Sequence, residues 1–336
     1  MTAVNRMDFI QAVVRIRVLE KRLLSELLFN RLIEAKDLEE VFRILNETDY
    51  AARLTAISRK EDYEHILSQE LEKVYQEARE ISPDPAVVDL LALKYDFHNL
   101  KVLLKEKFLN KDLSSLYLPI GSIDFSKIKK AYYEGNLRGF HLDYWEAISK
   151  AQEDFLQNKD PQRIDMILDR FYIEQLYQRA RKTDSELFID YVRTLIDFTN
   201  IRSLLRMQKM EKDLRFAEEV ILPHGNIDED LILNALHDSV EQLLEYFHNT
   251  NIHQTIVNGL KSYQETRRLT DFEKFMDDHL MEICRRAKYI HFGPEPIFAY
   301  VVAKETEIKN LRIIMVSKLN NISPEATRKR VRDIYV

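Results

Sequence analysis

The chain has 336 residues and a formal net charge of −6 at pH 7. Its 6 glycines and 8 prolines make up about 4% of the residues, against about 12% in an average protein, which excludes a turn-rich β fold. No glycine belongs to a G-x-G-x-x-G or G-x-x-x-x-G-K-[ST] loop, so neither type of nucleotide-phosphate cradle is present. An acidic chain also lacks the cationic surplus that a nucleic-acid-binding protein needs.

No segment of the sequence reaches the ~18 apolar residues of a membrane span, and charges interrupt the first twenty residues too often for a secretory signal. The single cysteine, Cys284, cannot form an internal disulfide and fits a reducing compartment, where we expect it to be a small core residue. We therefore expect a soluble chain of cytoplasmic type.

Apolar residues recur at steps of three and four from about Arg15 to Leu28, which predicts an amphipathic helix there. Similar patterns continue to the end of the chain, with breaks where proline and glycine gather. These breaks fall at residues 82–85, 118–121, 160–161, 222–225, 293–296 and 323–324. The sequence therefore predicts an all-α fold.

One short pattern occurs three times at intervals of about 100 residues. Residues 96–104 read DFHNLKVLL, residues 197–205 read DFTNIRSLL, and residues 307–315 read EIKNLRIIM. A second pattern, LPIGSID at 118–124, returns as LPHGNID at 222–228. A period this long exceeds that of the common helical repeats, so each unit is the size of a helical domain.

We predict three similar helical-bundle domains, at residues 1–115, 116–220 and 221–336, the last including a basic C-terminal tail. Three like domains in one chain can surround a pseudo-threefold axis, as three protomers do in a ring. The prediction is a funnel with an axial cavity. Residues 304–336 hold eight basic and four acidic residues, so the tail could contact anionic lipid or an acidic partner, or form a solvated helix end.

On a helix, the apolar residues of each repeated pattern form one arc, which predicts core. A carboxylate and an asparagine three residues later lie on one edge of that arc, and a cation flanks the other. We consider these nine residues as candidates for partner binding: Asp96, Asn99, Lys101, Asp197, Asn200, Arg202, Glu307, Asn310 and Arg312.

Three interpretations of these polar residues remain open. They can satisfy buried backbone or a neighbouring helix and so fix the helix register. They can face the pseudo-symmetry axis and bind a partner there. They can also act as a general acid–base pair, although a nearby cation in each repeat predicts ordinary ionised carboxylates and not raised pKa values.

No histidine has the spacing of a zinc site, and His279 and Cys284 lie five residues apart, off a common helical face. The acidic run Asp277-Asp278-His279-Leu280-Met281-Glu282 superficially resembles the magnesium box of class I terpenoid synthases. Without a second box, a solvated helix face is the better interpretation. We expect no metal, no cofactor and no small-molecule substrate.

The segments KYDFHNLKVLL at 94–104, IDFTNIRSLL at 196–205 and GPEPIFAYVVAKETEIKNLRII at 293–314 resemble the C subunit of the A/V-type rotary ATPases, whose eukaryotic counterpart is the d subunit. The likeness covers essentially the whole chain, including VRIRVLE at 14–20 and TDY at 48–50. The resemblance is to the bacterial sodium- or proton-linked V-type version of that subunit. The third pattern departs from the first two by having Glu307-Ile308 in place of Asp-Phe.

The resemblance implies a non-catalytic central-stalk protein made of three similar helical domains. Its open end would receive the rotor shaft, a coiled coil with a small companion protein, and its other end would rest on the membrane proteolipid ring. One copy per complex would transmit torque on the cytoplasmic face of the membrane, and the isolated chain would be a monomer. The alternatives are a scaffold of another assembly and, more remotely, a magnesium-dependent prenyl-diphosphate enzyme.

Overall fold

The computed structural model describes residues 5–54, 63–136 and 142–336, and these residues form helices joined by turns, with no strand among them. The all-α prediction is thus confirmed for the described part of the chain. None of the helices there is long and apolar enough to cross a membrane. The chain divides into two compact units, one from residues 1–88 and 254–336 and the other from Asp89–His253.

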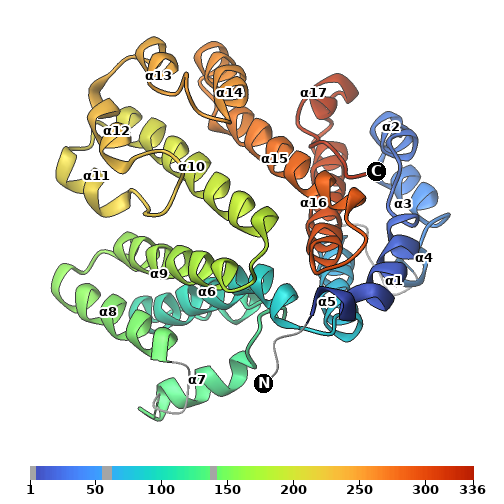
Figure 1. The fold of residues 1–336 in the computed structure, drawn as a ribbon, viewed down its shortest axis with the longest axis horizontal. Helices are drawn as coiled ribbons and strands as arrows, with labels where there is room; N and C mark the ends of the chain where they lie inside the picture. The colour runs from blue at the N-terminus through green and yellow to red at the C-terminus, as the bar shows by residue number, and fades with distance from the viewer. Residues whose placement is uncertain (1–4, 55–62, 137–141) are drawn as a thin grey trace. The chain divides into compact units, whose positions relative to one another are not determined.

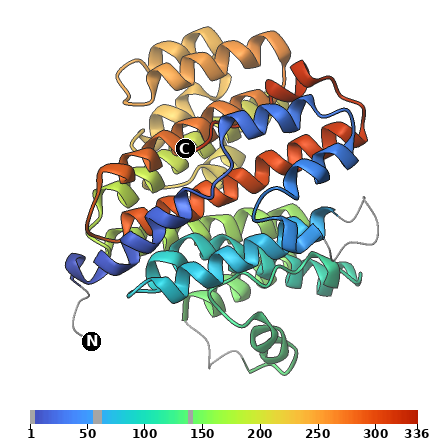
Figure 2. The same cartoon turned by 90° about the vertical axis from the view of Figure 1, so that its right-hand side faces the viewer.

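The first unit is built around its long C-terminal helix, α16 (Glu295–Leu319), which contacts α1, α3, α5, α15 and α17. Buried residues occur on every side of α16, as expected for a helix enclosed by others. Figure 2 shows α1 in dark blue beside α16 in red. The other helices of this unit are η1 (Arg6–Phe9), α1 (Ile10–Glu20), α2 (Glu26–Glu34), α3 (Leu38–Leu45), α4 (Ala51–Leu54), α5 (Tyr63–Ile81), α14 (His253–Thr266), α15 (Leu269–Arg285), η6 (Arg286–Tyr289) and α17 (Pro324–Arg328).

The second unit contains two further long helices, α6 (Ala86–Leu109), whose first residues precede the unit boundary, and α10 (Glu186–Lys209). Helices α8 and α9 pack side by side, and α9 also packs against α10 (Figure 1). The remaining helices are η3 (Ser114–Leu116), α7 (Phe125–Tyr133), α8 (Leu142–Asn158), α9 (Pro161–Arg181), α11 (Leu214–Val220), α12 (Glu229–Asn234), η5 (Ala235–His237) and α13 (Val240–Tyr246).

The apolar arcs predicted on the three long helices are confirmed as core. All twelve side chains are at most 2% exposed, so each long helix lies at the centre of its local packing. They are Phe97, Leu100, Leu103 and Leu104 on α6, Phe198, Ile201, Leu204 and Leu205 on α10, and Ile308, Leu311, Ile314 and Met315 on α16. Cys284 is also fully buried, as predicted.

The predicted breaks at proline and glycine coincide with helix ends. Helix α5 stops at Ile81 before the first break, α9 begins at Pro161, and α17 begins at Pro324. Proline is favourable at the first position of a helix because that position needs no donor, which explains why these breaks could be located from sequence.

The continuous helix predicted from about Arg15 to Leu28 is wrong. Helix α1 ends at Glu20 and α2 begins at Glu26, with Ser25 as its N-cap, accepting from the Leu28 N–H. The backbone N–H of Leu24 donates a hydrogen bond to the carboxylate of Glu307 at 2.7 Å. A tertiary hydrogen bond and a serine N-cap therefore end one helix and begin another, although the apolar residues keep their helical spacing through this segment.

The three long helices end in the same way. A residue just beyond the last turn of each helix has positive φ, namely Asn110 (49°), Glu211 (51°) and Asn321 (51°). The next residue then donates its N–H to the carbonyl five residues back, from Lys111 to Glu106, from Lys212 to Met207 and from Ile322 to Ser317. This is a Schellman motif, in which the left-handed position is usually glycine or asparagine.

Glu211 is the unusual residue of the three, because glutamate is strained at positive φ. We predict that Glu211→Gly is neutral or stabilises the chain by up to about 1 kcal/mol, since the relief of strain offsets the greater flexibility of the unfolded chain. The matched control is Glu153→Gly in the exposed interior of α8, which should cost about 1 kcal/mol. Urea unfolding of both variants measures the difference, and equal losses would contradict the prediction.

Candidate functional site

Each of the three repeated asparagines holds the backbone of a segment about twenty residues further along the chain. Asn99 accepts from the N–H of Leu118 at 2.9 Å and donates to its carbonyl at 2.8 Å. Asn200 makes the same pair of bonds with Leu222, both at 2.8 Å. Asn310 repeats the pair with Arg332, at 2.8 and 2.9 Å. Each amide thus replaces the partner that a neighbouring strand would supply.

The carboxylate of each repeat binds the backbone immediately before the next helix. Asp96 accepts from the Ile123 N–H at 3.4 Å and, through its other oxygen, from the Ser122 hydroxyl at 2.6 Å. Asp197 accepts from the Ile227 N–H at 3.0 Å and from the Asn226 amide at 2.9 Å. We call such a carboxylate, together with the asparagine three residues later, a clasp.

The glycines of the two LPxGxxD segments leave space for the clasp. A Cβ on Gly121 would lie 2.0 Å from Oδ1 of Asp96, and one on Gly225 would lie 2.3 Å from Oδ1 of Asp197. Each carboxylate lies so close to its glycine that no side chain would fit there. The carboxylate can therefore reach the N–H groups beyond the glycine only because the glycine has no side chain.

The third clasp joins the two ends of the chain. Glu307 accepts from the Leu24 N–H at 2.7 Å and from the Tyr50 hydroxyl at 2.9 Å. Lys304, on the preceding turn of α16, donates to Glu307 at 2.7 Å and lies 3.1 Å from Glu70. These groups are almost completely buried, so the charges are compensated inside the protein.

The three carboxylates bind equivalent backbone positions. Ile123 precedes Asp124, the N-cap of α7; Ile227 precedes Asp228, the N-cap of α12; and Leu24 precedes Ser25, the N-cap of α2. In the third repeat this position lies at the start of the chain and not after α16. The order of the clasps is therefore cyclic, from the first repeat to the second, to the third, and back to the first.

The six carboxylate and amide residues among our candidates are at most 3% exposed, and all bond to this chain. This favours the interpretation in which they satisfy buried backbone. The cations lie on the other edge of their helices, where Lys101 pairs with Asp169 of α9 and Arg312 pairs with Glu64. Arg202 is half-buried on α10. Direct partner binding by any of the nine residues stays a prediction.

The expectation of ordinary carboxylates was wrong for two of the three repeats. Burial raises the pKa of Asp96, although hydrogen bonds from Ser122, Ile123 and Tyr144 oppose the shift. Burial also raises the pKa of Asp197 to about 6, against hydrogen bonds from Ile227 and Asn226. Lys101 pairs with Asp169 of α9 and not with Asp96. Desolvation is the largest influence on both aspartates and decides the direction of the shift.

Two of the three acidic residues in the run at 277–282 are not solvated, which corrects our interpretation for them, whereas Glu282 is exposed. The side chains of Asp277 and Asp278 are 18% and 16% exposed. Asp277 bonds to Lys309 and Arg332, and Asp278 bonds to Lys274 and to the Asp333 N–H. The run thus attaches the C-terminal segment to α15.

Across the described ranges, no group of three or more His, Cys, Asp or Glu side chains could hold a metal ion.

The basic tail is largely neutralised within the first unit. Its C-terminal segment is anchored by Tyr335, which donates to Glu20 at 3.0 Å and is 2% exposed. Lys329 and Arg330 are exposed, and a contact of the tail with lipid or a partner stays a prediction for them. Six of the eight cations bond to carboxylates or a carbonyl of the same unit, namely Lys304, Lys309, Arg312, Lys318, Arg328 and Arg332.

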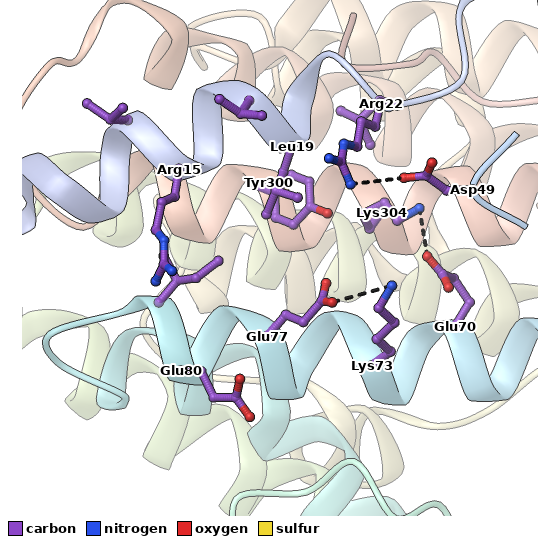
Figure 3. A pocket seen from close by; sticks show the side chains of 14 residues that line it. Arg15, Leu19, Arg22, Asp49, Glu70, Lys73, Glu77, Glu80, Tyr300 and Lys304 are labelled. Atoms are coloured by element: carbon purple, nitrogen blue, oxygen red, sulfur yellow. Dashed lines mark ion pairs between the residues drawn. The ribbon is translucent and has the colours of Figure 1, made fainter. Parts of the chain in front are cut away.

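A groove of about 420 Å³ lies between α1 and α5 in the first unit, with Tyr300 and Lys304 of α16 at its floor. Figure 3 shows Arg15 on α1 and Arg22 in the turn that follows α1, and Glu77 and Glu80 on the α5 side of the groove. Sequence analysis missed this groove. The exposed side of α1 was a detectable signal, because Val14 and Val18 repeat at one-turn spacing opposite the buried side.

Comparison with known proteins identifies one protein family and several similar members of it. The family model described as ATP synthase (C/AC39) subunit matches residues 12–330. The chain is similar to the C subunit of the V-type sodium ATPase of Enterococcus hirae, at 28% identity over 95% of this chain and 97% of that protein. It is also similar to the C subunits of the A-type ATP synthases of Methanocaldococcus jannaschii, at 28% identity covering 94% and 84%, and of Thermococcus kodakarensis, at 26% covering 95% and 89%.

A methyl group at Gly225 should damage the second clasp. We predict that Gly225→Ala destabilises the chain by about 2–3 kcal/mol, because the new Cβ displaces the Asp197 carboxylate. In an Asp197→Ala background the same substitution should cost at least ~1 kcal/mol less, since its clash partner is gone. Denaturant unfolding of the four proteins completes this cycle, and strictly additive losses would disprove the close approach.

The raised pKa of Asp197 predicts a pH-dependent stability difference. A folded-state pKa near 6, above the unfolded value near ~3.9, means that the folded chain binds the proton more tightly. As the pH falls from about 7 to about 3, the wild type should gain up to ~3 kcal/mol relative to Asp197→Asn. Urea unfolding across this pH range measures the gain. The exposed Asp184→Asn variant should parallel the wild type, and a parallel Asp197→Asn profile would refute the prediction.

Proposed function

The chain belongs to the ATP synthase (C/AC39) subunit family, and from this premise we propose that it is the non-catalytic central-stalk component of a V/A-type rotary ATPase. It would connect the soluble rotor shaft, a coiled coil with its small companion, to the membrane proteolipid ring. The printed names of its relatives, the C subunits of a V-type sodium ATPase and of A-type ATP synthases, support the assignment to such a complex.

The observation that carries the proposal is the cyclic order of the three clasps. Glu307 of the third repeat binds Leu24 at the start of the first, in the position that Ile123 and Ile227 occupy for the other two. A chain whose last repeat bonds to its first is suited to a closed pseudo-threefold arrangement. This supports three helical domains, at 1–115, 116–220 and 221–336, forming a funnel with an axial cavity.

A socket of this kind must transmit torque without deforming. Close-packed helices are stiff, and the long buried helices α6, α10 and α16 are rigid elements suited to such a socket. The socket must also separate from its shaft, so its contacts should be more polar than a domain core. We propose one copy per complex, held at the cytoplasmic face of the membrane by its partners, and a monomer when isolated.

The proposal predicts binding without catalysis. The purified chain should hydrolyse no ATP above background, but it should bind the shaft complex of the same organism in a titration calorimetry experiment. Raising the salt from about 50 to about 500 mM should weaken this binding about tenfold or more, because exposed charge pairs are screened. Co-sedimentation with proteolipid rings tests the other end. Failure to bind both partners would reject the proposed function, and binding indifferent to salt would reject polar coupling.

A further inference from the structure

The exposed side of α1 and of the short helix η1 before it carries an apolar stripe. Met7, Ile10, Val14 and Val18 are 53%, 38%, 60% and 52% exposed and follow one another at steps of three or four residues. The opposite side of α1, including Ile16, is buried. Single exposed apolar residues are ordinary on protein surfaces, but a continuous stripe at helical spacing marks a contact surface.

The stripe leads into the groove between α1 and α5. Val14 and Val18 line the groove from α1, Ile81 lines it from α5, and the buried Tyr300 lies at its floor. The lining residues of α5 run from Glu70 to Ile81, which is about three helical turns or ~16 Å. This length and the apolar centre fit an amphipathic helix laid along the groove.

The two walls of the groove carry opposite charges. Arg15 belongs to α1 and Arg22 to the turn directly after it, and Glu77 and Glu80 belong to α5 (Figure 3). Arg22 lies 3.7 Å from Asp49, with both side chains more than half exposed, and Lys73 lies 3.3 Å from Glu77. Such exposed pairs are weak and exchange partners readily. Anionic lipid or nucleic acid would be repelled by the α5 wall, whereas a helix with one acidic and one basic edge complements both walls.

We propose that this groove is the seat of one α-helix of the shaft coiled coil, whose apolar face covers Val14 and Val18. Its acidic edge lies against Arg15 and Arg22, and its basic edge lies against Glu77 and Glu80. This inference rests on the proposed function, because it identifies the surface on which the shaft binds. A helix that lies in a groove between two helices, with an apolar centre and charged edges, packs as the third helix of a three-stranded coiled coil does.

The floor of the groove is held rigid from below. Lys304 is 5% exposed and bridges Glu70 of α5 to Glu307 of the third clasp, at 3.1 and 2.7 Å. The Tyr50 hydroxyl completes the cluster through Glu307. A helix seated on this floor therefore contacts a prearranged surface and loses little free energy in ordering it.

The test is the affinity of the full chain for the shaft complex of the same organism. Val14→Glu combined with Val18→Glu should weaken binding at least about tenfold, because both side chains would lie under the apolar face of the helix. Arg15→Glu should weaken it about threefold or more and reduce its salt dependence. The control is Leu27→Glu on α2, which is 74% exposed outside the groove and should leave affinity within about twofold.

A second measurement does not depend on charge insertion. The only native cysteine is buried, and burial raises the pKa of its thiol, so an introduced cysteine can be labelled selectively. Saturating shaft complex should slow maleimide labelling of Val18→Cys at least about tenfold, and Leu27→Cys should react at an unchanged rate.

The outcomes separate the two proposals. If the wild type binds the shaft but the Val14/Val18 variant binds equally well, or Val18→Cys stays unprotected, the groove assignment is overturned and the proposed function stands. If the wild type does not bind the shaft at all, the proposed function itself fails. The wild type could instead associate with itself through the groove, so that its apparent molecular mass rises with concentration. If the combined Val14→Glu and Val18→Glu variant loses this association, the groove assignment is overturned in favour of a second copy of the chain.

Discussion

The hydrogen bonds between each clasp and the backbone that it holds are the constraint on which the architecture depends. A short extended segment outside any sheet has N–H and C=O groups that need partners once buried. Asn99, Asn200 and Asn310 each supply both partners to one residue, and the carboxylate three residues earlier supplies another. Removal of either side chain would leave buried backbone groups unpaired, at a cost of about 1–3 kcal/mol for each group. The backbone segments that the clasps hold are thereby fixed against the long helices that carry the clasps.

The third repeat shows why its sequence departs from the other two. Asp96 and Asp197 approach a glycine so closely that a Cβ would collide with the carboxylate. The segment held by Glu307 has no glycine at the matching position, because the residue three before the Ser25 cap is Arg22. A glutamate is one methylene longer and reaches both the Leu24 N–H and the Tyr50 hydroxyl from further away. The change from Asp to Glu thus follows from a different partner, and the position of that partner at the start of the chain makes the set of clasps cyclic.

Much of the fold could be predicted because its determinants are local. The apolar arcs of α6, α10 and α16 follow from helical spacing, and the helix starts at Pro161 and Pro324 follow from the missing proline N–H. The clasps could be detected as a repeat, but their partners could not be assigned, since Glu307 bonds to a residue near the other end of the chain. The same distance in sequence hid the break after α1 and the pairing of Asp277 with Arg332. The pKa of Asp197 was mispredicted because desolvation is a tertiary property.

Helix α16 connects the clasp to the groove. Tyr300 and Lys304 lie one turn apart at the floor of the groove, Glu307 lies on the next turn at the junction with the first repeat, and Asn310 follows at the C-terminal segment. Because Lys304 bonds to Glu307 inside the protein, a force applied at the groove reaches the junction through two buried ion pairs and one helix. Buried, compensated charges resist displacement more than exposed ones do, since separating them exposes each to a poorly polarisable interior. The floor of the groove is therefore connected to the bond between Glu307 and Leu24 through buried ion pairs and a helix, with no loop between them.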